Sequence, residues 1–360
     1  MAAYTTIDDP SAYFKVQLYT GNGSANHAIT FNDTDTDMQP DFVWIKNRDA
    51  TDANCLFDSV RGATKVVHSG TTDIEATDAD TLDSFTSDGF QVDADVKVNT
   101  SSEKYVAWCW KAGTTSGITT TNSTITPAGY SFNATSGFSI VQYDGNSTSG
   151  AKVPHGLNGI PDFVAIRNLD ASEAWICGHD ILSGTWTRYI RFDTDAAEHA
   201  SSVTARQWNN TAPTQYNVVL GDDGSVNTAT TRGYAMYSWK SIQGFSSISS
   251  YIGNGNADGP FVYTGFRVAY LMIKRVDAVK SWYIVDNKRN LYNGSTGLFL
   301  VVDKNDIEYS GAHLDIDFLS NGFKCRNADV AQNASGSNYI YMAFAEAPLV
   351  NSNGVPCNAR

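Results

Sequence analysis

The side chains that could do chemistry in this 360-residue chain are few, and they lack the spacings that catalysis needs. Glycoside hydrolysis uses two carboxylates about 5–10 Å apart that face one cleft. The sequence contains no Glu-x-Asp-x-x-Glu strand to carry such a pair, no Gly-x-Ser-x-Gly elbow and no phosphate-binding P-loop. Glutamates are scarce: Glu75, Glu103, Glu173, Glu198, Glu308 and Glu346. We therefore predict no catalytic residues, no enzymatic activity and no cofactor.

One acidic stretch has the alternating carboxylates of a calcium loop. Asp33, Asp35 and Asp37 alternate with threonines, but an EF-type loop needs glycine at its sixth position and glutamate at its twelfth. Met38 and Trp44 stand there instead. A second acidic stretch contains Asp73, Asp78, Asp80 and Asp83. The histidines also lack metal-ligand spacing: His27, His68, His155, His179, His199 and His313. We interpret both stretches as turns and predict no metal site.

Carbohydrate binding is the remaining chemistry. Sugars stack on exposed aromatic faces, while amides bind their hydroxyl groups. Trp208 and Asn209 lie in a polar, loop-like stretch, and Trp186 precedes them in the same region, so these three residues are our candidates for a glycan site. The alternative is that Trp208 fills the edge of a sandwich, because most large aromatic side chains are buried.

Composition narrows the class of protein. Hydrophobic residues make up 42% of the chain and charged residues only 18%, so the surface must be rich in Asn, Ser, Thr and Gly, which suit strands and tight turns. The net charge of −13, without a dense Lys/Arg run, argues against nucleic-acid binding. No apolar stretch approaches 18 residues, and the N-terminus lacks a signal-peptide pattern, so we expect no membrane span and synthesis in a cytoplasm. Five cysteines without a CxxC pair predict buried, reduced thiols.

Three markers recur three times in the same order. The first is a Tyr-x-Gly-Asn turn after an alternating strand, beginning at Tyr19, Tyr143 and Tyr251. The second is an apolar strand followed by a basic residue and an Asp-bearing turn, over residues 40–49, 161–170 and 268–277. The third is an aromatic strand over residues 105–111, 234–240 and 339–345. The second marker is apolar on both faces, which predicts a central strand covered on both sides.

These repeats predict an all-β chain of three tandem β-sandwich modules of the jelly-roll or lectin-like kind. We place the first module, with an N-terminal arm, at residues 1–112 and a Thr/Ser/Gly-rich connector at 113–137. The second and third modules follow directly on each other, at 138–242 and 243–348, and a tail covers 349–360. At this spacing we expect each module to have its own core.

The repeated motifs resemble those of a family of virion proteins of tailed bacteriophages, common in marine and freshwater phages. The resemblance rests on the Tyr-x-Gly-Asn-Gly turns and on five further segments: 40–48, 58–62, 258–267, 316–324 and 339–346. It covers nearly the whole chain and implies a concanavalin-A-like fold and a place on the virion. It offers no catalytic residues.

Three functions follow as expectations. The first is a non-enzymatic structural protein of the virion surface, such as a short fibre, tail appendage or capsid decoration, with a part in host adhesion. Its partners would be other virion proteins and further copies of itself, as a homo-oligomer and most simply a trimer. The second is a receptor-binding tail-tip lectin for host glycans, and the third is a polysaccharide depolymerase.

Overall fold

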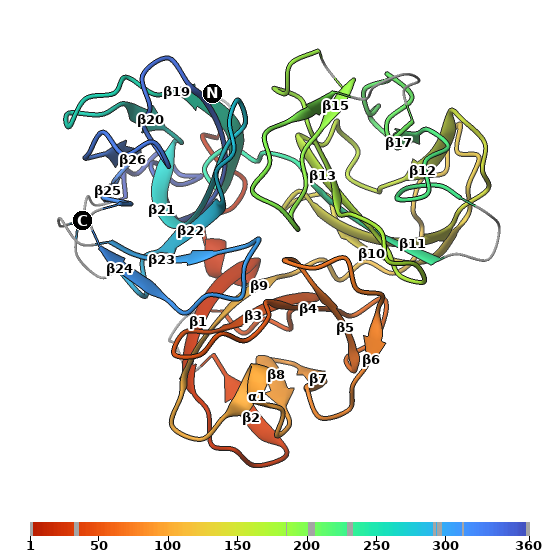
Figure 1. The fold of residues 1–360 in the computed structure, drawn as a ribbon, viewed down its shortest axis with the longest axis horizontal. Helices are drawn as coiled ribbons and strands as arrows, with labels where there is room; N and C mark the ends of the chain where they lie inside the picture. The colour runs from red at the N-terminus through yellow and green to blue at the C-terminus, as the bar shows by residue number, and fades with distance from the viewer. Residues whose placement is uncertain are drawn as a thin grey trace.

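The computed structural model describes residues 3–31, 36–184, 186–200, 206–228, 233–290, 293, 297–311 and 313–357. Over these residues the fold is all-β, as predicted, and helix is confined to a 3-10 turn, η1 (Pro10–Ala12), and one short helix, α1 (Val96–Asn99). No helix in this described part is both long and apolar enough to cross a membrane. The strands gather in three units around a common centre (Figure 1).

The first unit is a sandwich of two antiparallel sheets. Its large sheet has the order β1 (Phe14–Thr20), β9 (Lys104–Trp110), β3 (Phe42–Asn47), β4 (Cys55–Asp58), β5 (Lys65–His68), β6 (Ala76–Thr77). Its small sheet has the order β2 (His27–Thr30), β8 (Gly89–Val92), β7 (Leu82–Thr86). Apolar residues of both sheets share one hydrophobic cluster, as the facing sides of a sandwich do.

The other two units repeat this strand order. In the second unit the large sheet has the order β10 (Pro127–Asn133), β11 (Phe138–Asp144), β18 (Gly233–Trp239), β13 (Phe163–Asn168), β14 (Ile176–His179). Two further pairs of short strands belong to this unit: β12 (Ala151–Pro154) with β17 (Asn217–Leu220), and β15 (Arg188–Tyr189) with β16 (His199–Ala200). The additional edge strand β10 comes from the segment that the sequence suggested was a connector.

In the third unit the large sheet runs β19 (Ser246–Ile252), β27 (Asn338–Pro348), β21 (Phe266–Arg275), β22 (Trp282–Asp286), β23 (Gly297–Val301), β24 (Tyr309–Gly311). Its small sheet runs β20 (Phe261–Tyr263), β26 (Gly322–Cys325), β25 (Ile316–Leu319). The strand register matches as well. In each unit an aromatic residue of the third marker pairs with an aromatic residue of the second marker: Trp110 with Phe42, Trp239 with Phe163, and Phe344 with Tyr270.

The central strands of the large sheets are buried on both faces. Every residue of β3 is buried, and successive residues alternate between two cores: Val43 and Ile45 face the small sheet of their own unit, while Phe42 and Trp44 belong to a cluster that draws on all three units. The prediction of a central strand covered on both sides is therefore confirmed, and the second cover comes from the neighbouring units.

The shared cluster joins every pair of units through aromatic rings. Phe14 of the first unit stacks on Phe344 of the third with ring centroids 4.8 Å apart, and Phe42 lies 5.0 Å from Tyr237 of the second. Phe163 and Trp282 join the second and third units at 6.3 Å. Each unit also keeps a cluster of its own. The expectation of separate cores is thus incomplete, because a fourth core lies between the units.

Polar contacts run around the centre in one direction. The basic residue at the end of each marker strand is buried and donates to a backbone carbonyl of the next unit: Lys46 to Asn305 (3.3 Å), Arg167 to Asp73, and Lys274 to Asp195 (3.1 Å). The first unit therefore contacts the third, the third contacts the second, and the second contacts the first.

Two further sets of hydrogen bonds follow this cycle. Side-chain donors at equivalent positions cross to the next unit in the same direction, from Asn54 to Val301, Trp175 to His68 and Trp282 to Arg191. In the opposite direction, the backbone N–H groups of three glutamates donate to backbone carbonyls of the neighbouring unit at 2.8–2.9 Å: Glu75 to Leu169, Glu198 to Val276 and Glu308 to Arg48. The three interfaces are therefore equivalent, as in a ring with approximate threefold symmetry.

Candidate functional site

The three glycan candidates form a packed cluster. Trp208 is 1% exposed and Trp186 is 2% exposed, and their rings meet edge to face with centroids 5.1 Å apart. Gly178 provides the room, because a Cβ atom there would lie 2.2 Å from the Trp186 ring. Asn209 is half-buried, and its Oδ1 accepts a hydrogen bond from Ser149 at 2.9 Å. Since neither indole offers a face to solvent, the packing interpretation replaces the glycan-binding one at these residues.

The acidic stretches provide no metal centre in the part of the chain that the structure describes. No group of three His, Cys, Asp or Glu side chains gathers there in a way that could hold an ion. Asp33 and Asp35 lie outside the described residues. In the second stretch, Asp78 forms an ion pair with Lys97 at 3.7 Å, which marks it as part of the surface of the first unit.

Two buried aspartate–arginine pairs have a structural role in the core. Asp58 binds Arg61 at 2.5 Å and accepts a hydrogen bond from Tyr237 of the second unit at 2.7 Å. The third unit repeats this with Asp286 and Arg289 at 2.6 Å, where the cross-unit donor is Trp108. Residues 58–62 carry part of the family resemblance, but the sequence did not mark Asp58 and Arg61 as a buried pair, because an Asp-x-x-Arg spacing is common. Fully paired groups without solvent access are suited to holding units together.

Four of the five cysteines, Cys55, Cys109, Cys177 and Cys325, are buried free thiols, as predicted. Burial raises the pKa of each of them. A buried thiol with a raised pKa is a poor nucleophile, so these residues belong to the cores.

The third unit contains a cavity of about 370 Å³ beside β22, β23 and β24. Aromatic side chains from all three strands line it: Tyr283, Phe299 and Tyr309. Phe299 stacks on Tyr309 with centroids 5.1 Å apart and meets Tyr283 edge to face at 5.6 Å. This volume lies within the range of small-molecule sites. The sequence analysis did not select these residues, because they are far apart in the chain and carry no motif.

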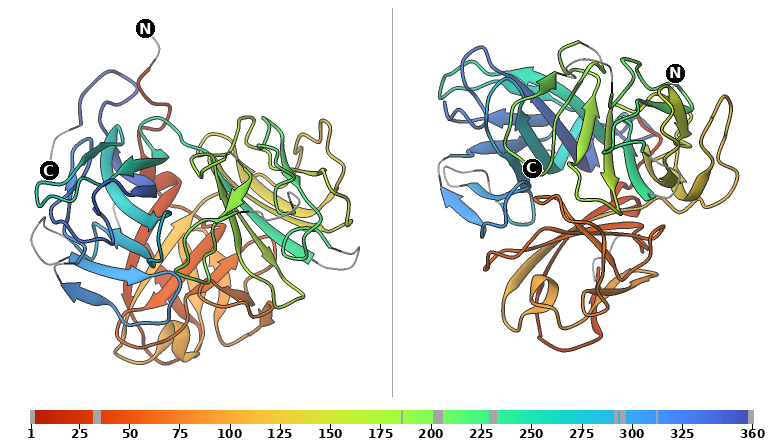
Figure 2. Two further views of the ribbon diagram at one scale, coloured as in Figure 1. Left: turned by 45° about the horizontal axis from the view of Figure 1, so that its top comes forward. Right: turned by 45° about the vertical axis from the view of Figure 1, so that its right-hand side comes forward.

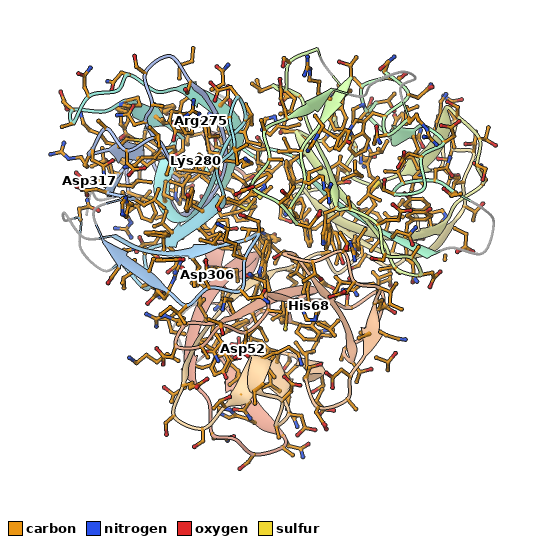
Figure 3. All side chains as sticks on the ribbon, viewed as in Figure 1. Asp52, His68, Arg275, Lys280, Asp306 and Asp317 are labelled. Atoms are coloured by element: carbon orange, nitrogen blue, oxygen red, sulfur yellow. The ribbon has the colours of Figure 1, made fainter. Side chains whose placement is uncertain are left out.

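Charged side chains stand around the same cavity: Lys280, Lys304, Asp306, His313 and Asp329. Lys280 and Asp306 are labelled in Figure 3, both on the third unit. The Tyr309 hydroxyl donates to Asp306 at 2.7 Å, and the His313 ring nitrogen lies 2.9 Å from Asp329. Burial, together with the nearby Asp303 and Asp329, raises the pKa of Tyr283 to about 12, so its hydroxyl stays protonated at neutral pH. An aromatic wall with a charged rim can bind a polar ring compound.

Comparison with known protein families gives one match. A model described as a domain of unknown function, DUF7483, matches residues 9–348, and the chain belongs to this family. The matched region takes in all three units and the shared core between them. No curated protein and no solved structure matches the chain.

Proposed function

We propose that this protein is a non-enzymatic structural protein of a bacteriophage virion surface, a short fibre, tail appendage or capsid decoration that contributes to adhesion to the host. The observation that carries the proposal is the closed ring of three units. The central strands of the large sheets are covered on both faces, so the units form one body whose turns and small sheets face outward. Such a body suits display on an assembly. The motifs that resemble phage virion proteins support the same role.

The two ends of the chain offer one attachment surface. Tyr4 donates to the Gly265 carbonyl at 2.8 Å, which places the N-terminal arm on the third unit. Asp8 accepts the backbone N–H of Ser352 at 2.6 Å, so the C-terminal tail lies against the same arm. The arm and the tail run close together beside the third unit in the left view of Figure 2. We propose that other virion proteins bind the chain here, on the side where both terminal segments meet.

Mass spectrometry and electron microscopy of purified virions test this role. The protein should be present in many copies per particle, as density of three lobes attached through the third unit. Its absence from washed virions that contain the other structural proteins would overturn the proposal. Light scattering decides the state of association, since one chain has a mass of 39.1 kDa and the expected homotrimer about three times as much.

A further inference from the structure

We infer that the cavity of the third unit binds a saccharide that carries a carboxylate group, such as a hexuronic acid unit of a polysaccharide. The biological meaning of this site rests on the adhesive role proposed above. The binding itself is a property of the purified chain and is tested without virions.

One ring of the aromatic wall, Tyr309, is exposed at the surface, whereas Phe299, on which it stacks, is buried. Tyr309 is 40% exposed, Val330, which also lines the cavity, is 43% exposed, and Ile307 is exposed as well. Tyr309 is held in place on one face by Phe299 and at its hydroxyl by Asp306. A rigid ring with an uncovered surface is suited to the C–H face of a pyranose, because little side-chain entropy is lost on binding.

The charges at the rim favour an anionic group on that sugar. Asp306 is engaged by Tyr309, while Asp329 accepts from His313 and also from the backbone N–H of Ala331 at 2.8 Å. Lys280 and Lys304, by contrast, have no carboxylate within ion-pair distance among the described residues. The rim therefore carries two carboxylates that already accept hydrogen bonds and two ammonium groups that have no carboxylate partner. A carboxylate on the ligand would supply the missing partner.

The equivalent positions of the first unit show that this wall is not required by the fold. The strand register places Cys55, Val66 and Ala76 of the first unit where the third has Tyr283, Phe299 and Tyr309. The second unit has Ile176, Tyr189 and His199 at these places. Only the third unit, over the described residues, combines three aromatic rings at these positions with the cavity beside them. The three-ring wall is therefore a feature of this unit, although the second unit stacks Tyr189 on His199 at the matching positions with centroids 5.1 Å apart.

Calorimetric titration of the full chain with tetragalacturonate and tetramannuronate, each beside its neutral methyl ester, tests the inference. At least one acidic tetrasaccharide should bind at least 10-fold more tightly than its ester, and added salt should weaken that binding. Tyr309→Ala, which introduces the residue found at the equivalent Ala76, should weaken binding at least 10-fold. The double variant Lys280→Ala/Lys304→Ala should remove the preference for the acid.

The matched control is Phe261→Ala, because Phe261 is an aromatic residue of the same unit, 45% exposed, that does not line the cavity. It should leave affinity unchanged, and a thermal melt should show that every variant is folded. Equal binding of acids and esters would overturn the role of the lysines, and no binding of any saccharide would overturn the site. A chain that binds the acid but is missing from virions would overturn the virion role alone.

Discussion

At the scale of single residues, one stacked tyrosine pair and one buried asparagine recur in each unit. The pairs Tyr19–Tyr105, Tyr143–Tyr234 and Tyr251–Tyr339 stack with centroids 5.0–5.1 Å apart. The asparagines Asn99, Asn227 and Asn333 each accept the backbone N–H of the Asn in the Tyr-x-Gly-Asn motif at 2.7–2.9 Å. The motif therefore links the strand that it follows to the segment before the last strand of the unit.

The glycine of this motif shows what the sequence can and cannot reveal. We interpreted it as a turn residue, and it does end a strand. Glycine is required there, however, because a second segment passes close to its Cα atom. A Cβ atom on Gly253 would lie 2.2 Å from the Ala334 carbonyl oxygen, and a Cβ atom on Gly21 would lie 2.1 Å from the Thr100 carbonyl oxygen. The sequence marks such a glycine but does not name the distant segment that passes it.

These hydrogen bonds predict that Asn333→Ala lowers the free energy of unfolding. The Asn333 side chain is fully buried and also donates to the carbonyls of Asn256 (2.8 Å) and Asn327 (2.9 Å). Its loss leaves partly buried backbone groups without this partner, so we expect the free energy of unfolding to fall by about 2–3 kcal/mol. Urea unfolding measures this. Asn353→Ala, at an exposed position in the tail, is the control and should change stability by less than about 0.5 kcal/mol.

At the scale of elements, the marker strands explain why the sequence shows a basic residue after each apolar run. A lysine at the end of a strand usually indicates the surface. Here Lys46 and Lys274 are fully buried, and their ammonium groups bind backbone carbonyls of two units. Burial lowers the pKa of each lysine to about 8 and that of the Arg167 guanidinium to about 10. The pattern was visible in the sequence, but the neighbouring unit that accepts the hydrogen bond was not.

These lysines give the interfaces a measurable pH dependence. The pKa of Lys46 is about 8 in the folded chain and 10.5 in its ordinary state, so below pH 8 the buried charge costs about 3 kcal/mol. Above pH 8 the folded state loses that proton first, and the cost shrinks until about pH 10.5. The stability of the wild type relative to Lys46→Met should therefore rise by about 2 kcal/mol between pH 7.5 and pH 9.5.

Urea unfolding of both proteins across this range measures the difference. The difference is the useful quantity, because the buried cysteines, whose pKa values burial raises, lower the stability of both proteins alike as the pH rises. Lys288→Met, at an exposed position, should follow the wild type at every pH. A constant difference between wild type and Lys46→Met would show that Lys46 keeps an ordinary pKa in the folded chain.

At the scale of the whole molecule, the shared core was the feature least accessible from the sequence. The all-β class could be predicted from composition and alternation, and the doubly covered strands from their apolar faces. The sequence could not show what covers the second face of these strands. Residues such as Phe42 and Trp110 give the same pattern whether they pack on a separate layer of the same unit or on a neighbouring unit. For the same reason Trp208 and Trp186 could be named as candidates, although their burial follows from contacts made far along the chain.

The shared core predicts a single cooperative unfolding transition. The three units cannot separate without exposing rings such as Trp110, which lies 5.6 Å from Tyr270 and 6.4 Å from Trp239. Differential scanning calorimetry should therefore give one peak whose calorimetric and van't Hoff enthalpies agree. Trp110→Ala should lower the free energy of unfolding by about 3–5 kcal/mol and move the whole peak. Separate peaks for separate units would contradict a shared core.

Closure of the ring within one polypeptide has a consequence for stoichiometry. Three separate chains would meet only above a certain concentration and would show every surface feature three times. Here the linkers hold the units at a high effective concentration at any dilution, and each third is free to differ from the others. Tyr309 and Ala76, at matching places on two sheets, are such a difference. A ligand of the third unit should thus saturate at one per chain, and firm attachment to a polysaccharide would require many chains side by side.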